Sequence, residues 1–172
     1  MASSASRSFS PPEAARALRG AVACRLATGE RELEAHMALR WQVFAEEQGI
    51  FAGDDADGRD EAPETLHAIG LVGERICGTV RLYPLDRDGR RWKGDRLAVA
   101  RECRSSHVGA ELVRFAVRTA GELGGSEMVA HVQLANVRFF ERLGWSTVGS
   151  PALFHGVEHQ LMRIGLSARR GP

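Results

Sequence analysis

The sequence has few of the features that mark several classes of protein. Its 172 residues include only three cysteines, Cys24, Cys77 and Cys103, an odd number at scattered positions without a Cys-x-x-Cys pair. This spacing argues against a disulfide framework and against a zinc site, and it is typical of a reducing compartment. The formal net charge is only +1, so no overall field favours nucleic acid or an anionic membrane as a partner.

Long apolar runs are also absent. Nowhere do 18 apolar residues follow one another, and residues 1–12, rich in Ser, Ala and Pro, lack an apolar core of signal-peptide length. We therefore expect a cytoplasmic protein without a membrane partner. The length, with 44% hydrophobic and 26% charged residues, favours a single domain at residues 13–166, with a disordered segment at 1–12 and a loose tail at 167–172.

Strand and helix patterns alternate along the chain. Apolar residues recur at helical spacing in three stretches, which predicts helices over 30–48, 107–123 and 136–143. The apolar positions of the first helix are Leu33, Met37, Trp41 and Phe44. Short apolar runs predict strands, at residues 21–27, 66–72, 76–82, 97–100, 128–132, 145–148 and 157–164. Polar loops are expected at 49–63 and 86–94.

A turn of mostly small residues opens the second predicted helix. It consists of Arg104, Ser105, Ser106, His107, Val108, Gly109 and Ala110. Such a turn points several backbone N–H groups outward at a helix N-terminus, where a phosphate or pyrophosphate can bind. Taken alone, the turn indicates a simple helix cap at least as strongly.

Two motifs in this order resemble the GNAT (GCN5-related) N-acyltransferase superfamily, over roughly residues 21–164. The turn 104–110 is similar to the family's Arg/Gln-x-x-Gly-x-Gly/Ala loop, with His107 in place of the first glycine. The segment 136–145, Asn-Val-Arg-Phe-Phe-Glu-Arg-Leu-Gly-Trp, is similar to the family's Asn…Phe-Tyr-Glu-x-x-Gly-Phe segment. The resemblance implies a mixed α/β (α+β) fold. Its mostly antiparallel sheet of six to seven strands would be flanked by helices and splayed between the fourth and fifth strands.

The resemblance also implies acetyl-CoA as the acyl donor, with no metal. In the family, the pantetheine arm pairs with the backbone of the fourth strand, here Leu97, Ala98 and Val99, and the loop 104–110 holds the pyrophosphate. Asn136 would supply a side-chain contact, and Phe140 would lie against the cofactor. Many relatives have a tyrosine acid at the position of Phe140, but a phenyl ring donates no proton. The acid is then missing, replaced by water, or supplied elsewhere; the one tyrosine is Tyr83.

The general base is left open among three candidates. Glu47 ends the first predicted helix, and His131 and His159 lie on predicted strands where they can face the acceptor cleft. A histidine on a strand is more often a hydrogen-bonded structural residue, so each of them stays a candidate only.

A narrower resemblance involves an acidic segment. Residues 46–64 hold eight carboxylates against one arginine, which favours a cationic amine unless they form only a solvated loop. Three segments, residues 40–48, 54–60 and 78–84, are similar to a GNAT subgroup associated with nitrogen-starvation gene sets. They are also similar, more weakly, to acyl-homoserine-lactone synthases. The latter implies contacts with an amino-acid-like substrate, here from Arg40, Phe44, Asp55, Asp57, Asp60 and Arg81. The alternative for Arg81 is a salt bridge that simply pins the acidic loop.

We therefore expect an N-acetyltransferase that moves an acetyl group from acetyl-CoA to the amine of a small amino-acid-like or cationic molecule by direct transfer. One alternative is an acyl-homoserine-lactone-like synthase. Another, motivated by His107 and Phe140, is a catalytically weak CoA-binding sensor module. No nucleic-acid partner is expected, and because this fold often dimerises, a homodimer stays open.

Overall fold

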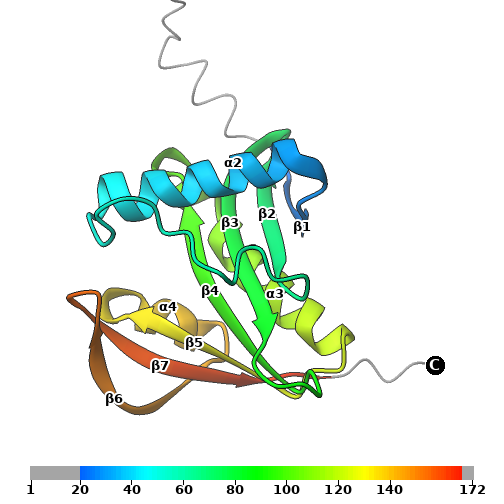
Figure 1. The fold of residues 1–172 in the computed structure, drawn as a ribbon, viewed down its shortest axis with the longest axis vertical. Coiled ribbons are helices and arrows are strands. Elements are labelled where there is room, and N and C mark those ends of the chain that lie inside the picture. The colour runs from blue at the N-terminus through cyan, green and yellow to red at the C-terminus, as the bar shows by residue number, and fades with distance from the viewer. Residues whose placement is uncertain (1–19, 168–172) are drawn as a thin grey trace, which may run out of the picture.

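Seven strands form one sheet in the order β1-β2-β3-β4-β5-β7-β6 (Figure 1). This computed structural model describes residues 20–167, so the expected disordered segment 1–12 and tail residues 168–172 lie outside the described part. Every neighbouring pair of strands is antiparallel except β4 and β5, which confirms the expected sheet. The strands are β1 (Val22–Leu26), β2 (Leu66–Val72), β3 (Arg75–Pro84), β4 (Arg91–Val99), β5 (Glu127–Gln133), β6 (Ser146–Phe154) and β7 (Val157–Gly165).

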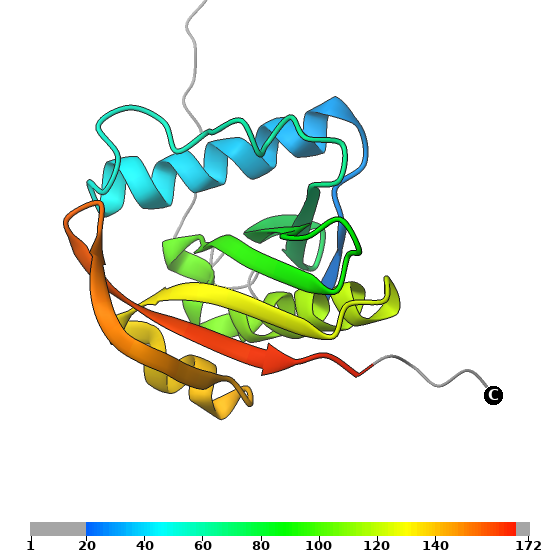
Figure 2. The same cartoon turned by 60° about the horizontal axis from the view of Figure 1, so that its bottom comes forward.

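Helices cover both faces of the β1–β4 half of the sheet. α2 (Gly29–Trp41) lies on one face and α3 (Val108–Glu122) on the other, as Figures 1 and 2 show. α2 runs on into a π-helical segment, η1 (Gln42–Glu47), and a 3-10 segment, η2 (Arg101–Ser106), leads into α3. A second 3-10 segment, η3 (Leu134–Asn136), and the short helix α4 (Val137–Arg142) follow β5.

The buried face of α2 differs from the prediction. Leu33 and Trp41 are 38% and 44% exposed, whereas His36, Leu39 and Arg40 are buried. The apolar spacing predicts the helix correctly, but its inner face carries polar groups that find partners inside the protein. Burial, with the neighbouring His67, lowers the pKa of His36 to about 3, so this imidazole is buried in its neutral form.

β4 is longer than the predicted strand 97–100. The prediction is too short because the charged residues before Leu97 favour a loop when the sequence is considered alone. The strand begins at Arg91, inside the expected loop 86–94, and its alternating pattern buries Trp92 while Lys93 and Asp95 point to the opposite face. β6 is also longer than expected. It is one of the two edge strands, and its residues are almost all exposed, so its sequence gives little apolar signal.

The sheet opens between β4 and β5. The two strands pair in parallel only from Arg91 to Lys93, opposite Glu127 to Val129, and then diverge. Beyond this point β4 carries a bulge, where Arg96 and Leu97 stand opposite Val80 alone, and Arg96 has a φ of 54°. The divergence and the bulge together leave backbone groups of β4 facing a gap.

Two glycines bring α3 close to the sheet. Gly70 of β2 and Gly78 of β3 face each other in the register. A Cβ built on Gly70 would lie 2.5 Å from Cγ2 of Val108, and one on Gly78 would lie 2.7 Å from Cδ1 of Leu112. Because these two glycines have no side chain, the first turn of α3 can lie close to the sheet. Its distance from the sheet also fixes the position of the loop that precedes the helix.

The structure corrects the expectation for the cysteines. Cys77 of β3 and Cys103 of η2 are joined as a disulfide, with their Cα atoms 5.9 Å apart, and both are fully buried. Their separation of 26 residues follows no motif that would have indicated the pair. The bond ties the centre of the sheet to the segment leading into α3, and Cys24 is left as a free thiol.

We expect Gly70→Ala to lower the free energy of unfolding by about 1–3 kcal/mol, because the added methyl group meets Val108 and Leu112 in a packed core. Urea denaturation followed by circular dichroism measures the change. Gly165→Ala is the matched control, since Gly165 is also in a strand but a Cβ added there would have no atom within 4 Å. Equal effects of the two substitutions would contradict the role assigned to Gly70.

Candidate active site

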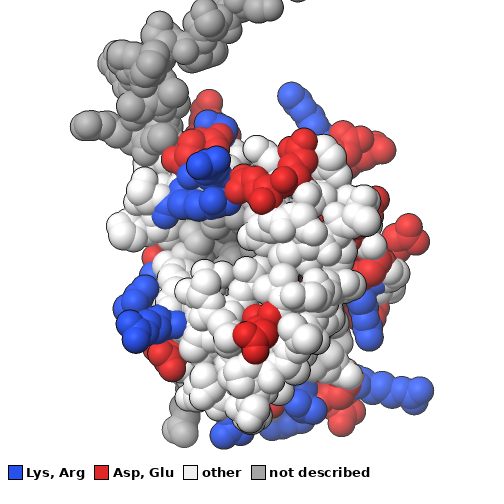
Figure 3. Space-filling view, turned by 90° about the vertical axis from the view of Figure 1, so that its left-hand side faces the viewer, with Lys and Arg blue, Asp and Glu red and all other residues white. Residues whose placement is uncertain are grey.

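A pocket lies where β4 and β5 diverge, with a volume of about 980 Å³ that includes space open to solvent. Backbone and side chains of residues 93–97 form one wall, and residues 128, 130–133 of β5 form the other. Figure 3 shows this side of the molecule hollowed, with mostly uncharged atoms around the hollow and charged side chains gathered above it.

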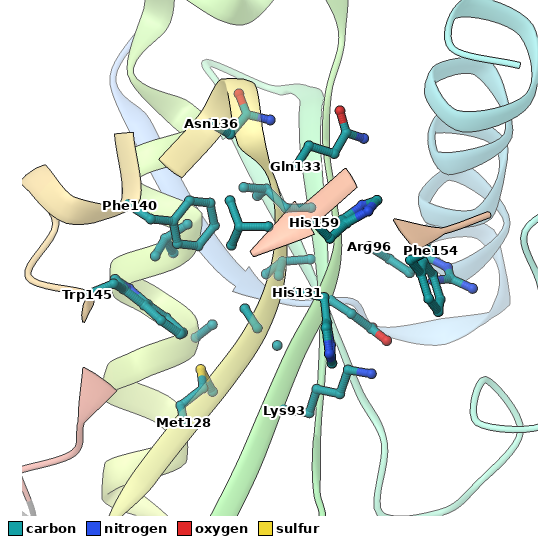
Figure 4. Close-up of a pocket in the computed structure, with 18 of the residues that line it drawn as sticks. Lys93, Arg96, Met128, His131, Gln133, Asn136, Phe140, Trp145, Phe154 and His159 are labelled. Atoms are coloured by element: carbon teal, nitrogen blue, oxygen red, sulfur yellow. The ribbon is translucent and has the colours of Figure 1, made fainter. Parts of the chain in front are cut away.

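The pocket has two chemically different ends (Figure 4). Met128, Phe140 and Trp145 stand together at an apolar end, which Val113 and Ala116 of α3 also line. At the other end lie the polar or aromatic side chains of Lys93, Arg96, His131, Phe154 and His159. The pocket thus offers one apolar compartment and one that can hold polar groups and exchange protons.

His131 is placed to accept a proton. Its side chain faces the pocket from β5, and Phe154 stacks on the imidazole with ring centroids 6.2 Å apart. Burial, together with the nearby charges of Lys93 and His159, lowers its pKa from the ordinary value of 6.5. The imidazole is therefore neutral at pH 7, which is the form that a general base requires.

The other two candidate bases each have a bonded partner. Nδ1 of His159 lies 2.8 Å from the carbonyl oxygen of Val157, and because a carbonyl only accepts, Nδ1 carries the proton. Glu47 forms an ion pair with Arg104, Oε2 to Nη2 at 2.5 Å, and is not among the residues that line the pocket. His131 lines the pocket with a ring that has no hydrogen-bond partner among the described residues, and His159 lines it with an unprotonated Nε2, so both rings can accept a proton there.

The loop expected to bind pyrophosphate contains a left-handed residue at the start of α3. η2 ends at Ser106, the next residue His107 has left-handed angles (φ 65°, ψ 2°), and α3 begins at Val108. A residue with a Cβ thus adopts a conformation that glycine favours. The Ser106 hydroxyl donates to the carbonyl oxygen of Cys103 at 2.6 Å, which holds the turn.

The predicted cofactor residues divide between this loop and the pocket. Leu97, Asn136 and Phe140 line the pocket. Ala98 and Val99 continue β4 beyond it, and none of the loop residues 104–110 contributes to the pocket wall. The loop and the gap are nevertheless linked, because Nε of Arg104 donates to the carbonyl oxygen of Val99 at 3.3 Å.

The predicted substrate contacts are brought together, but most are buried in an ion network. Nε and Nη1 of Arg40 donate to Asp55 and Asp60 at 2.8 and 2.6 Å, and Nη1 of Arg81 donates to Asp57 at 2.6 Å. Arg40 and Arg81 are 0% and 1% exposed, and of the predicted set only Phe44 lines the pocket. The structure matches the alternative in which Arg81 pins the acidic loop; direct contact of these side chains with a substrate stays a prediction.

Several pocket residues escape prediction from the sequence. Arg96, Phe51 and Phe154 form an aromatic and cationic rim, in which the Arg96 guanidinium lies 4.9 Å from the ring centroid of Phe51. Lys93 falls within the expected loop 86–94. The bulge that turns Arg96 toward the acidic loop has no sequence signal, although the alternation around Trp92 is a usable sign of a longer strand.

Tyr83 does not serve as the missing acid. Its hydroxyl lies 3.3 Å from Oδ2 of Asp95, and burial together with that carboxylate raises its pKa to about 12. It does not line the pocket, whereas Phe140 does. Within residues 20–167, no group of three or more His, Cys, Asp or Glu side chains could hold a metal ion, and no helix is long and apolar enough to span a membrane.

The fold is that of an N-acyltransferase: the fourth and fifth of seven strands diverge, a pocket lies in the gap between them, and a loop precedes the central helix. The model of the acetyltransferase (GNAT) family matches residues 31–145, so the chain belongs to that family of enzymes. Two Bacillus subtilis (strain 168) proteins are similar to it. BSU40680 is 28% identical over 136 residues, which cover 78% of this chain and 90% of the relative. The uncharacterized N-acetyltransferase YjcF is 26% identical over 140 residues, covering 80% and 96%.

Solved structures share the fold at lower identity. ElaA of Escherichia coli has a TM-score of 0.73 at 21% identity, with 83% of this chain and 99% of that chain covered. The CoA-dependent acyl-homoserine-lactone synthase BjaI has a TM-score of 0.66 at 22% identity, with 80% and 76% covered. The expected likeness to an acyl-homoserine-lactone synthase is therefore present at the level of the fold.

We expect His107→Gly to keep the turn and to raise the free energy of unfolding by up to about 1 kcal/mol, because glycine adopts a positive φ without a Cβ clash. His107→Val should lower it by about 1–2 kcal/mol, since a β-branched residue resists this conformation. Urea denaturation measures both. Ser105→Val, at the exposed neighbouring position, is the control; an equal loss there would contradict a specific backbone requirement at His107.

Proposed function

We propose that the protein transfers an acetyl group from acetyl-CoA to the amine of a small-molecule acceptor by direct transfer. The observation that carries the proposal is the divergence of β4 from β5 after Lys93 and Val129, which sets a small-molecule pocket beside an unpaired strand edge. Family membership supports an acyl-CoA donor, and the pocket supports a ternary arrangement in which both substrates meet within the gap.

The residues around the gap fit an acyl-CoA. The β5 side of β4 has no strand partner beyond Lys93, so backbone groups of residues 94–99 can pair with the amides of a pantetheine arm as an added strand does. The N-terminus of α3, with the left-handed turn at His107, offers N–H groups to a pyrophosphate. Arg104 adds a cation beside that turn, once its pair with Glu47 is exchanged for phosphate oxygens.

The pocket residues supply most of the chemistry of amine acylation. His131 takes the proton from the attacking nitrogen, and the new N–C bond forms as the C–S bond of the thioester breaks. A backbone N–H at the bulge of Arg96 and Leu97 can donate to the negative charge that develops on the carbonyl oxygen. Phe140 gives no proton to the sulfur, so coenzyme A leaves as a thiolate, which is tolerable because an ordinary thiol has a pKa of about 8.5.

The test is a thiol-release assay with acetyl-CoA and a panel of primary amines, alongside calorimetric titration of the protein with CoA. We expect CoA binding and acceptor-dependent release of thiol, with one N-acetylated product formed per thiol, identified by mass spectrometry. CoA binding without turnover on any amine would instead support a sensor. Turnover only with S-adenosylmethionine and a longer acyl donor would support a lactone-forming synthase. No binding at millimolar CoA would overturn every acyl-CoA function.

We expect His131→Gln to lower kcat by roughly 10²–10⁴-fold, the usual contribution of a general base, while the affinity for CoA is retained. The lowered pKa of His131 gives the sign of the pH effect. The ratio of wild-type to variant kcat/KM should rise with pH through a pKa below 6.5 and then level off, as the imidazole becomes neutral.

His159→Gln is the matched control for this prediction. His159 lines the same pocket, so if His131 is the base, the ratio of wild-type to His159→Gln kcat/KM should stay flat with pH. A flat ratio for His131→Gln, or an equal one for His159→Gln, would contradict the role of His131 as the base.

A further inference from the structure

Lys93 stands at the vertex of the gap between β4 and β5. It is the last residue of β4 that pairs with β5, opposite Val129, and its half-buried side chain lines the polar end of the pocket (Figure 4). Within residues 20–167, its ammonium group makes no hydrogen bond or ion pair. An ammonium group in such a position has lost part of its hydration without gaining a partner.

The other charges of the pocket wall are compensated. Both carboxylate oxygens of Asp95 accept from Arg81, from Nε and Nη2, each at 2.8 Å. Arg96 is paired with Asp55 and Asp57, at 2.9 and 3.3 Å. Because His131 is neutral, Lys93 is the charged group of the pocket wall that remains for a ligand. This local positive charge contrasts with the many carboxylates of residues 46–64.

The positions of Lys93 and His131 fix what an acceptor there must look like. His131 follows Val129 by two residues on β5, so its side chain points to the same face of the sheet as that of Lys93. Figure 4 shows the two side chains next to each other at one end of the pocket. A molecule that places an anion on Lys93 therefore places a group a few bonds away beside the imidazole of His131.

We propose that the acceptor is an amino acid with a free carboxylate, which Lys93 binds while the amine lies against His131. The proposal rests on the proposed acyl transfer and narrows its acceptor. An amino acid has its anion and its nucleophile separated by one or a few carbon atoms, which suits two neighbouring side chains. A diamine or polyamine carries no anion, and its second cation is repelled by Lys93 in a partly desolvated pocket.

The test compares each of a set of L-amino acids with its carboxamide, which keeps the amine but lacks the carboxylate charge. With the wild-type protein, kcat/KM should be higher for the amino acid. Lys93→Met should lower kcat/KM for the amino acid by roughly 10–100-fold, the usual range for losing a charge-assisted hydrogen bond, mainly through KM. The carboxamide should be nearly unaffected. For each protein, kcat/KM for the amino acid is divided by kcat/KM for its carboxamide, and the wild-type value is then divided by the variant value. This double ratio cancels the different basicity of the two amines.

Two further variants make the result specific. Lys93→Arg keeps the charge and should preserve the preference for the carboxylate. Arg91→Met removes a neighbouring cation on β4 that is largely exposed and paired with Glu127, and should leave the double ratio at one. Circular dichroism spectra and CoA titration of every variant show whether the fold and the donor site are intact. The dication cadaverine and the trication spermidine should be poor acceptors for the wild type, and Lys93→Met should improve both.

The outcomes separate this inference from the acyl transfer itself. Turnover of carboxamides or polyamines as fast as of amino acids, with no effect of Lys93→Met, would overturn the carboxylate site and leave the acyltransferase standing. If no amine is acylated, calorimetric titration of amino acids and carboxamides into the CoA-saturated protein still decides the inference. Equal binding of the two, in the wild type and in Lys93→Met, would overturn it.

Discussion

A buried ion network around Arg40 and Arg81 holds α2, β3, β4 and the segment 48–65 together. Asp60 accepts from Arg40 at 2.6 Å and lies 3.0 Å from Nη1 of Arg81, so it joins the two guanidinium groups. Burial opposes the charge on Arg81, but its hydrogen bonds to Asp95 and Asp57 raise its pKa, so the ion persists inside the protein. Such a network is a constraint more than a source of stability, because removing one buried partner leaves the other unpaired at a cost of about 3–5 kcal/mol.

The network explains why a long irregular segment can border the pocket between β4 and β5. Residues 48–65 contain no helix or strand, yet Asp55, Asp57 and Asp60 bind it to α2, β3 and the bulge of β4. The same segment supplies Ile50 and Phe51 to the pocket. Because Asp55, Asp57 and Asp60 are paired with arginines, the acidic composition of the segment does not become an acidic pocket, and a cationic amine as the acceptor stays a prediction.

Much of the fold was predictable from motifs and periodicity. The apolar face of residues 108–122 predicts α3, and the small residues before it predict the turn. The motif at residues 136–145 predicts α4 after β5. The failures have a common physical cause. His36 and Arg40 are buried with partners from distant parts of the chain, so they look like surface residues in the sequence and shift the predicted face of α2. The charged residues on one face of β4 likewise look like a surface loop in the sequence. The first part of that strand, which includes Lys93, is therefore not predicted.

Backbone strain marks the site in a way that composition does not. Among the described residues, three non-glycine residues have a positive φ: Arg96, His107 and His155. Arg96 is at the bulge that borders the pocket, and His107 forms the turn that opens α3. His155 touches Phe51 and Phe154 on the pocket rim, with ring centroids 4.8 and 4.4 Å away. Strained conformations persist only where the surroundings enforce them. Here the disulfide beside η2 and the ion pairs of Arg96 do so, which places the most constrained backbone around the space where both substrates would meet.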